Sequence, residues 1–144
     1  MTQSQAAQPV YDAIETLIRA AVPADAKVFQ VNMPFQLMST LTREISRIVT
    51  FMITADRRRV NSSGVTPVHE ISVEIHFYGT LADADEMASA FSDLVSGEEY
   101  TTKGWTIAID QQSRRDIWEP QVSVKHVWTQ FKGLAIAPES GTAG

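Results

Sequence analysis

The chain contains no cysteine, which excludes thiolate catalysis and cysteine-ligated metal sites and gives no reason to expect an oxidising compartment. It also lacks any apolar run near the ~20 residues that span a bilayer, and its first residues (MTQSQ) lack the basic and apolar regions of a signal peptide. Its 12 Lys+Arg are outnumbered by 17 Asp+Glu, giving a net charge of -5. We therefore expect a soluble protein made in the cytosol, and not one that binds nucleic acid by neutralising phosphates.

Catalytic motifs are missing as well: there is no phosphate-cradling glycine loop, no nucleophile elbow and no pair of histidines at helical spacing. His69 and His76 are an odd number of residues apart, so one strand would point them to opposite faces, and His126 is remote in sequence. Glu70, Glu74 and His76 share a face and could bind a metal, but a solvated or interface-facing strand surface is the favoured interpretation. We expect no enzyme, no catalytic or metal-ligating residue and no cofactor.

What is present is a chain of 144 residues, 44% hydrophobic, which is long enough for one ordinary core. Residues 1–8 are polar and predicted to be disordered, residues 9–137 form a single domain, and residues 138–144 are a disordered tail. No internal repeat or second domain boundary is visible.

The clearest unit runs from Val68 to Gly97. Within residues 69–78 the apolar side chains Ile71, Val73, Ile75 and Phe77 alternate strictly with polar ones, which predicts a strand with one buried face, and Gly79 ends it. Residues 80–83 (TLAD) resemble a capping box, and Gly97 suits a helix end. The predicted buried side chains are Ile71, Val73, Ile75 and Phe77 on the strand and Met87, Phe91 and Leu94 on the helix.

The remaining segments extend this pattern in both directions. A helix is predicted from Pro9 to just before Pro23, and strands over 26–31, 47–55, 105–110 and 122–131, the last with a β-bulge near Lys125 and His126. Polar connections are predicted over 56–64, 98–103 and 111–116. The order α-β-β-β-α-β-β predicts an α+β fold: a largely antiparallel sheet of four to five strands with two helices packed on one face.

Two further features of the sequence each allow two interpretations. Residues 32–46 fit neither helix nor strand period, so they are either a long connection with exposed apolar groups or a short helical turn at the sheet edge. Trp118, beside Pro120, is either a sheet residue or a surface anchor.

Charge is distributed unevenly along the sequence. No lysine or arginine occurs from Val60 to Thr102, a segment rich in Asp and Glu, whereas arginines cluster at 57–59 and 114–115, within predicted connections. This separation favours complementary surfaces that meet on another molecule, with uneven solvation of a soluble domain as the alternative.

The element order and several segments resemble the tail terminator proteins of long-tailed bacteriophages. The resemblance covers about residues 9–135 and rests on pattern and topology, with no compact signature. The segments that carry it are the helix over 11–23, the strand over 71–79 (ISVEIHFYG), the helix over 84–94 and the closing pair of strands.

This resemblance implies a structural virion protein that caps the tail tube, stops its polymerisation and forms the joint to the head as a hexameric ring through which the genome passes. It implies no activity and no cofactor. Implied partners are other copies of the chain, the tube protein and a head-completion (connector) protein, without specific genome binding or a membrane. The implied location is the tail/neck junction of the virion, after assembly in the host cytoplasm.

For such a ring we predict a subunit interface in which separated charges meet and exposed apolar groups supply the affinity. Alternatives are a head-closure or tube protein, or a small α+β ligand-binding domain. The predicted interface residues are Arg57, Arg58, Arg59, Arg114, Arg115, Asp83, Asp85, Glu86, Met33, Phe35, Leu37 and Met38.

Overall fold

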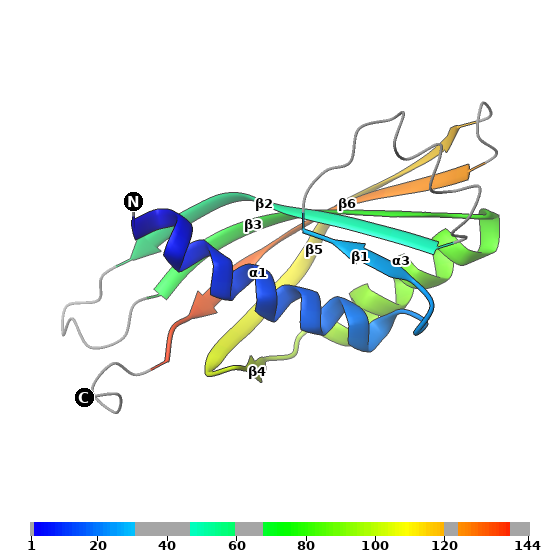
Figure 1. Ribbon diagram of the computed structural model, residues 1–144. Helices are drawn as coiled ribbons and strands as arrows, with labels where there is room; N and C mark the ends of the chain where they lie inside the picture. Colours follow the sequence, from blue (N-terminus) through cyan, green and yellow to red (C-terminus); the bar gives the residue numbers. More distant parts are fainter. Residues whose placement is uncertain (1, 31–46, 60–67, 120–123, 139–144) are drawn as a thin grey trace.

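The computed structural model describes residues 2–30, 47–59, 68–119 and 124–138, and it forms two layers, a curled sheet with helices on one face (Figure 1). The strands are β1 (Lys27–Phe29), β2 (Arg47–Arg59), β3 (Val68–Gly79), β4 (Tyr100–Thr102), β5 (Trp105–Glu119) and β6 (Val124–Ile136). Their order across the sheet is β1-β2-β3-β6-β5-β4.

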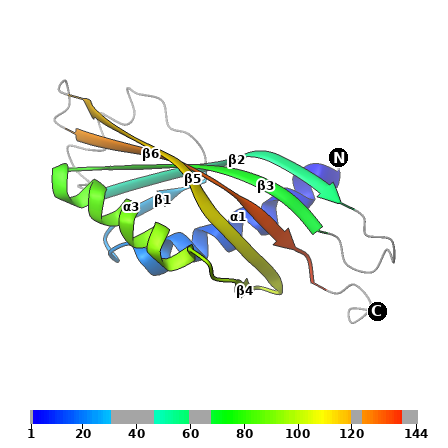
Figure 2. The same ribbon diagram turned by 180° about the vertical axis from the view of Figure 1, so that it is seen from behind.

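The α+β class and the two-layer arrangement agree with the sequence-based prediction, but the sheet differs in detail. It has six strands instead of four to five, because β4 lies within the predicted linker 98–103 and pairs with the start of β5. It is mixed, because β1 runs parallel to β2 while the other pairs are antiparallel. The long strands form two hairpins: β2 ends beside the start of β3 at one end of the molecule, and β5 ends beside the start of β6 at the other (Figure 2).

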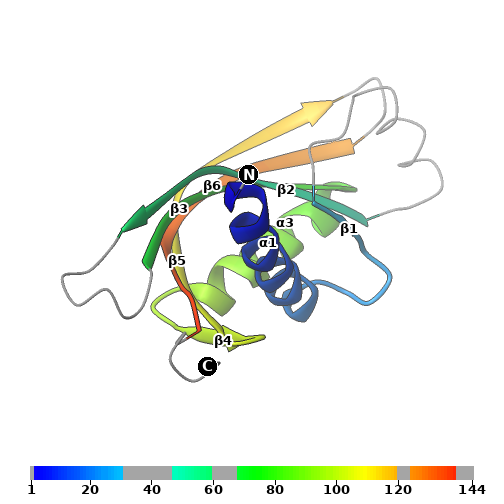
Figure 3. The same cartoon turned by 60° about the vertical axis from the view of Figure 1, so that its left-hand side comes forward.

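Helices α1 (Thr2–Ala21) and α3 (Leu81–Val95) both cover the concave face of the sheet (Figure 3). Their apolar stripes meet the inward-facing side chains of the central strands, and aromatic rings stack at the contact, with Phe91 and Phe131 edge to face at 5.1 Å. The predicted burial of Ile71, Val73, Ile75 and Phe77 on β3 is confirmed, but the other face is not wholly exposed, since His76 and Tyr78 are also buried.

The predicted start of α1 at Pro9 is wrong, because the helix begins at Thr2 and Pro9 lies inside it. Downstream, Val10, Ile14 and Ile18 are fully buried, and this packing outweighs the hydrogen bond that a proline removes. The helix ends at Ala21, before Pro23, as predicted.

Only the C-terminal end of α3 matches the prediction. Thr80 is the N-cap residue, but its hydroxyl donates to the Asp83 carboxylate (3.0 Å) and accepts no hydrogen bond from a backbone N–H, so no capping box forms. At the other end Gly97 has a φ of +69°, the left-handed conformation expected of a residue just past a helix. Its N–H donates to the side chain of Asp110 at 3.1 Å, which ties the helix end to β5.

Both hairpins are longer than predicted. Arg57–Arg59 extend β2, and residues 111–116 continue β5, so these arginines lie in strands and not in connections. Polar side chains there do not mark a turn, because they lie where a strand faces solvent. The bulge predicted near Lys125 and His126 is also wrong: β6 pairs with β3 without a shift, and the irregularities fall at Ile53/Ala55 and Gln111/Ser113.

The change of phase in β6 has another cause. Val124 is buried (5% exposed) on the face of the sheet opposite the helices, which we call the outer face, while Val127 and Phe131 are buried on the helix face. Residues 32–46, with Met33, Phe35, Leu37 and Met38, and the predicted tail residues 139–144 lie outside the described residues. Among the described helices, none is long and apolar enough to cross a membrane.

Candidate assembly surface

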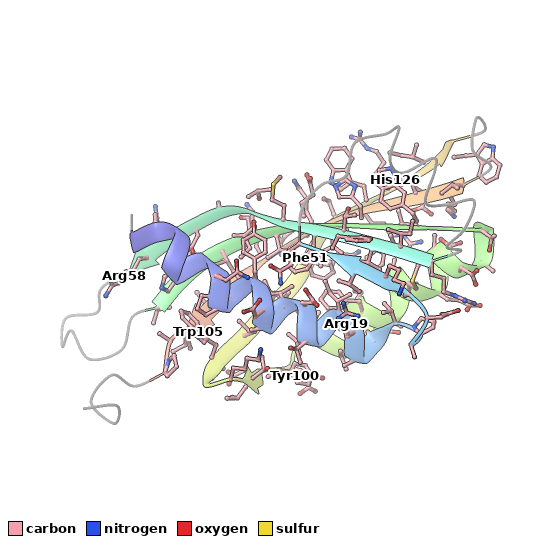
Figure 4. All side chains as sticks on the ribbon, viewed as in Figure 1. Arg19, Phe51, Arg58, Tyr100, Trp105 and His126 are labelled. Atoms are coloured by element: carbon pink, nitrogen blue, oxygen red, sulfur yellow. The ribbon has the colours of Figure 1, made fainter. Side chains whose placement is uncertain are left out.

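The predicted interface residues fall into separate places in the fold. Asp83, Asp85 and Glu86 are on the first turns of α3, at the end of the molecule where β5 and β6 are connected. Arg57 and Arg58 are exposed on β2 toward the opposite end, where Figure 4 labels Arg58. The backbone of Arg59 is in β2, and its side chain is outside the described residues.

Arg114 and Lys125 of the β5–β6 hairpin form a cluster of ion pairs with Asp85 and Asp116, which we call the hairpin charge cluster. Arg114 Nη2 lies 2.6 Å from Asp85 Oδ1, and Arg114 Nε donates to Asp116 Oδ1 at 2.8 Å. Lys125 Nζ reaches Asp85 Oδ1 at 2.9 Å and Asp116 Oδ2 at 3.1 Å. The cluster therefore joins α3 to both strands.

The hairpin charge cluster stabilises its own charged state. Hydrogen bonding to Arg114, and then to Lys125, lowers the pKa of Asp116 below its ordinary 3.8. Hydrogen bonding to Asp85 raises the pKa of Lys125, and hydrogen bonding to Asp116 raises the pKa of Arg114. Asp116, Lys125 and Arg114 are therefore ionised at neutral pH.

Other predicted charges are also paired inside the subunit. Arg57 Nη2 bonds Glu70 Oε1 at 2.8 Å across β2 and β3, and Arg47 bridges Asp25 (2.8 Å) and Asp83 (3.3 Å). Part of the complementarity predicted between subunits is thus satisfied within one. Arg115 is different, since its guanidinium lies 5.3 Å from the ring centroid of Trp128 on the outer face.

A hollow of about 330 Å³ opens between the end of α1 and the start of α3. Apolar side chains form its floor and charged ones its rim; the lining residues are Ala21, Val22, Pro23, Met87, Ala90, Arg47, Asp83 and Glu86. We call it the α1–α3 hollow. Asp83 and Glu86 were predicted from the sequence, but the hollow was not, because its signal is limited to two small residues on different helices, Ala21 and Ala90.

The outer face near the end of β3 carries a stack of rings, Tyr78, His126, His76 and Trp128. His76 Nε2 lies 2.9 Å from Glu74 Oε2, and His76 Nδ1 lies 2.5 Å from His126 Nε2. Figure 4 shows His126 on the side of the sheet away from the helices.

Burial, helped by the neighbouring His76, lowers the pKa of His126 from 6.5 to about 4, so it is neutral at pH 7. His69 lies on the opposite face of β3, where its Nδ1 is 2.7 Å from Asp56 Oδ1. Within the described ranges no group of three or more His, Asp or Glu side chains gathers to hold a metal ion.

Trp118 is the large apolar side chain that the described part of the chain leaves exposed, at 49%. It pairs in register with Lys125, whose amine reaches Asp85 of α3, so alternation places Trp118 on the helix face, at the end of the hairpin. Its exposure agrees with the surface-anchor alternative.

Comparison with known proteins adds little to this geometry. No protein-family model matches the chain, and no curated protein does. Among solved structures, it is similar to a chain from the "Virion of native gene transfer agent (GTA) particle", with 15% identity over 83% of this chain and 84% of that chain and a TM-score of 0.48. This likeness is too distant to carry an argument about fold or function.

Proposed function

We propose that the chain is a non-enzymatic structural subunit of a phage-like virion, and specifically that it caps the tail tube as a ring, ends tube polymerisation and forms the joint to the head. Its partners are then other copies of the chain, a tail tube protein and a head-completion protein. The resemblance to tail terminators motivates the proposal. The described order, α1-β1-β2-β3-α3 followed by the closing strands, is the predicted order with β4 added.

The observation that carries the proposal is the asymmetry of the subunit. Its two hairpins are connected at opposite ends of the sheet (Figure 1), and α3 presents one flank to α1 and the other to the β5–β6 hairpin. A ring larger than a dimer uses heterologous contacts, in which one patch on a subunit meets a different patch on the next. A subunit with unlike sides is suited to such contacts.

The edges of the sheet favour a closed assembly over an open one. The edge strands β1 and β4 cover only the first residues of β2 and β5, and the uncovered lengths carry bulges and charges. Bulges and charges are the devices that prevent indiscriminate strand pairing. One edge N–H, that of Ile53, is instead bonded to the Tyr11 hydroxyl at 3.0 Å. Contacts between subunits through side-chain patches are therefore favoured over pairing of their edge strands.

The decisive experiment combines sizing with tube assembly. Purified protein should sediment as a species larger than a dimer and appear as rings in negative-stain images. Added to polymerising tube protein from the same genome, it should stop growth and appear at one tube end. Tubes that keep growing with no ring bound would refute the terminator role even if rings form, and would favour another neck component.

The genome is proposed to pass without being held, because the chain is acidic overall. We expect no shift of duplex DNA at ~0.15 M salt in an electrophoretic assay. The rival from another class is a small ligand-binding domain, which the α1–α3 hollow favours. A protein that stays monomeric and shows a ligand-dependent rise in melting temperature would support that rival.

A further inference from the structure

We propose that Trp118 of one subunit inserts into the α1–α3 hollow of the next, and that this contact closes the ring. This inference rests on the proposed function, because it requires a ring of identical chains. The occupant of the hollow is then a second copy of this chain.

The side chain that inserts is unusual in this fold. An exposed tryptophan loses little conformational freedom on binding and buries a large apolar area, and tryptophans are the residues most enriched among interface hot spots. Trp118 is 49% exposed on the helix face. Trp105, which is 9% exposed, is buried against His69, and Trp128 lies in the outer-face stack, so neither is available in this way.

The hollow offers a matching receptor. At about 330 Å³ it lies at the lower end of the size range of pockets that enclose small organic molecules, which suits one indole ring. Met87 is 1% exposed and Val22 is 8% exposed, so the floor is fixed by the core and would not need to rearrange. Ala21 and Ala90 are short, and their size keeps the hollow open.

The two patches lie on opposite flanks of the first turns of α3. Asp85 and Ser89 face the hairpin, where they meet Arg114, whereas Asp83, Met87 and Ala90 face the hollow. Trp118 therefore lies beyond one flank of α3 and the hollow lies on the other. A side chain and a receptor on opposite sides of one subunit cannot meet within it, but they can repeat from each subunit to the next around a ring.

The charges around the hollow favour the proposed pairing over a contact between two hollows. The hollow has Asp83 and Glu86 on its rim, with Arg47 already paired to Asp25 and Asp83, and Glu86 forms no ion pair with any described residue. The hairpin brings Arg115, which contacts the Trp128 ring and not a carboxylate in the described structure, and which lies on the outer face, opposite to Trp118. Arg115 cannot touch the rim while Trp118 is inserted, so its attraction to the acidic rim acts only at longer range, whereas two hollows would repel one another.

The test uses one variant on each side of the contact. Trp118→Ala removes the inserting side chain, and Ala90→Lys fills the hollow. Each should raise the concentration at which the ring forms by at least tenfold in sedimentation velocity. Ile117→Ala, a neighbouring truncation on the outer face, and Ala55→Lys, an exposed site on β2, are the matched controls and should change it less than threefold. Circular dichroism verifies that each variant folds.

Mixing the two defective variants gives the sharper result. Trp118→Ala keeps an intact hollow and Ala90→Lys keeps an intact tryptophan, so the mixture should form a one-to-one dimer that cannot grow. Neither variant alone should form this dimer. A contact between two copies of the same patch would not produce it.

The outcomes separate this contact from the ring itself. If the wild type forms rings and both variants do so at the same concentration, the contact is wrong and the ring stands. If the folded wild type stays monomeric up to about 1 mM and adds no ring to tubes, the contact and the proposed ring both fail. Assembly of the folded variants that is indistinguishable from that of the controls overturns the inference in any case.

Discussion

The two faces of the sheet are stabilised by different kinds of interaction. The helix face buries rings and aliphatic chains, among them Phe51, Phe77, Phe91 and Phe131, all at 0% exposure. The outer face carries Glu74, His76 and His126 in a hydrogen-bonded series. Apolar burial contributes about 25 cal/mol per Å² without regard to direction, whereas buried polar groups need fixed partners. The helix face therefore supplies the stability, and the outer face and the ends of the sheet are left to carry specific contacts.

The largest expected effect tests this difference on adjacent residues of β6. Phe131 points to the helices and Gln130, next to it, is exposed on the outer face. Phe131→Ala should lower the free energy of unfolding by about 3 to 5 kcal/mol, through lost burial and a cavity, and Gln130→Ala by less than about 0.5 kcal/mol. Urea denaturation measures both. Equal losses would mean that the faces are not assigned correctly.

The second-largest expected effect concerns the close approach of β6 to β5 at Gly133. A Cβ added at Gly133 would lie 1.9 Å from the carbonyl oxygen of Ala108 and 2.7 Å from Cα of Ile109, both backbone atoms of β5. Neither can move without opening the β5–β6 pairing, so Gly133→Ala should cost about 3 kcal/mol.

The control is Gly97→Ala, where φ is positive but no atom lies within 4 Å of the new Cβ. It should cost only about 1 kcal/mol, the strain of a left-handed alanine. Thermal unfolding of both variants gives the comparison, and a Gly133→Ala protein as stable as Gly97→Ala would show that β6 can move away from β5.

These residues also show which parts of the structure sequence could predict. Period-2 and period-3.6 patterns predicted β3 and α3 well, because the side of each element that meets the core is buried and the pattern records that burial directly, although His76 and Tyr78 of β3 are buried on the outer face as well. The same rule failed in β6, where Val124 is buried on the outer face and breaks the alternation without a bulge. β4 was missed because three residues with one half-buried tyrosine carry no period.

The candidate surface was predictable only in part. Composition located the acidic turns of α3 and the arginine clusters, but not their geometry, because polar runs were interpreted as connections. Arg114 in a strand meets Asp85, 29 positions away in the chain, and no local pattern encodes such a pair. The α1–α3 hollow depends on which helix faces which, a tertiary property that spacing along one helix does not contain.

The third effect is a pH dependence that belongs to the outer face. His126 has a pKa of about 4 in the folded protein against 6.5 unfolded, so the unfolded chain binds more protons between these values. Stability should fall as pH drops from 6.5 to 4, by an amount on the order of 2 kcal/mol after allowance for the partial exposure of the ring.

The variant His126→Asn should flatten that part of the profile. The groups facing His126 are His76 and Tyr78 of β3, Ile117 of β5 and, through His76, Glu74. Glu74→Gln is therefore measured alongside it. Urea unfolding at pH 7 and pH 5 gives the slopes, and a His126→Asn protein that keeps the wild-type slope would assign the pH dependence to another group.

The smallest effect concerns the hairpin charge cluster. Asp85 accepts from both Arg114 and Lys125, whose side chains are 27% and 17% exposed, so screening is incomplete. Asp85→Asn should cost about 1 kcal/mol in low salt and less than half of that in ~1 M salt, because the Debye length then falls to about 3 Å. Asp25→Asn, which removes a pair to Arg47 from a carboxylate that is 63% exposed, should cost almost nothing at either salt concentration. A loss of stability in Asp85→Asn that does not depend on salt would mean that the cluster stabilises the protein by packing. This end of the molecule would then be stabilised in the way the helix face is, and not in the way the outer face is.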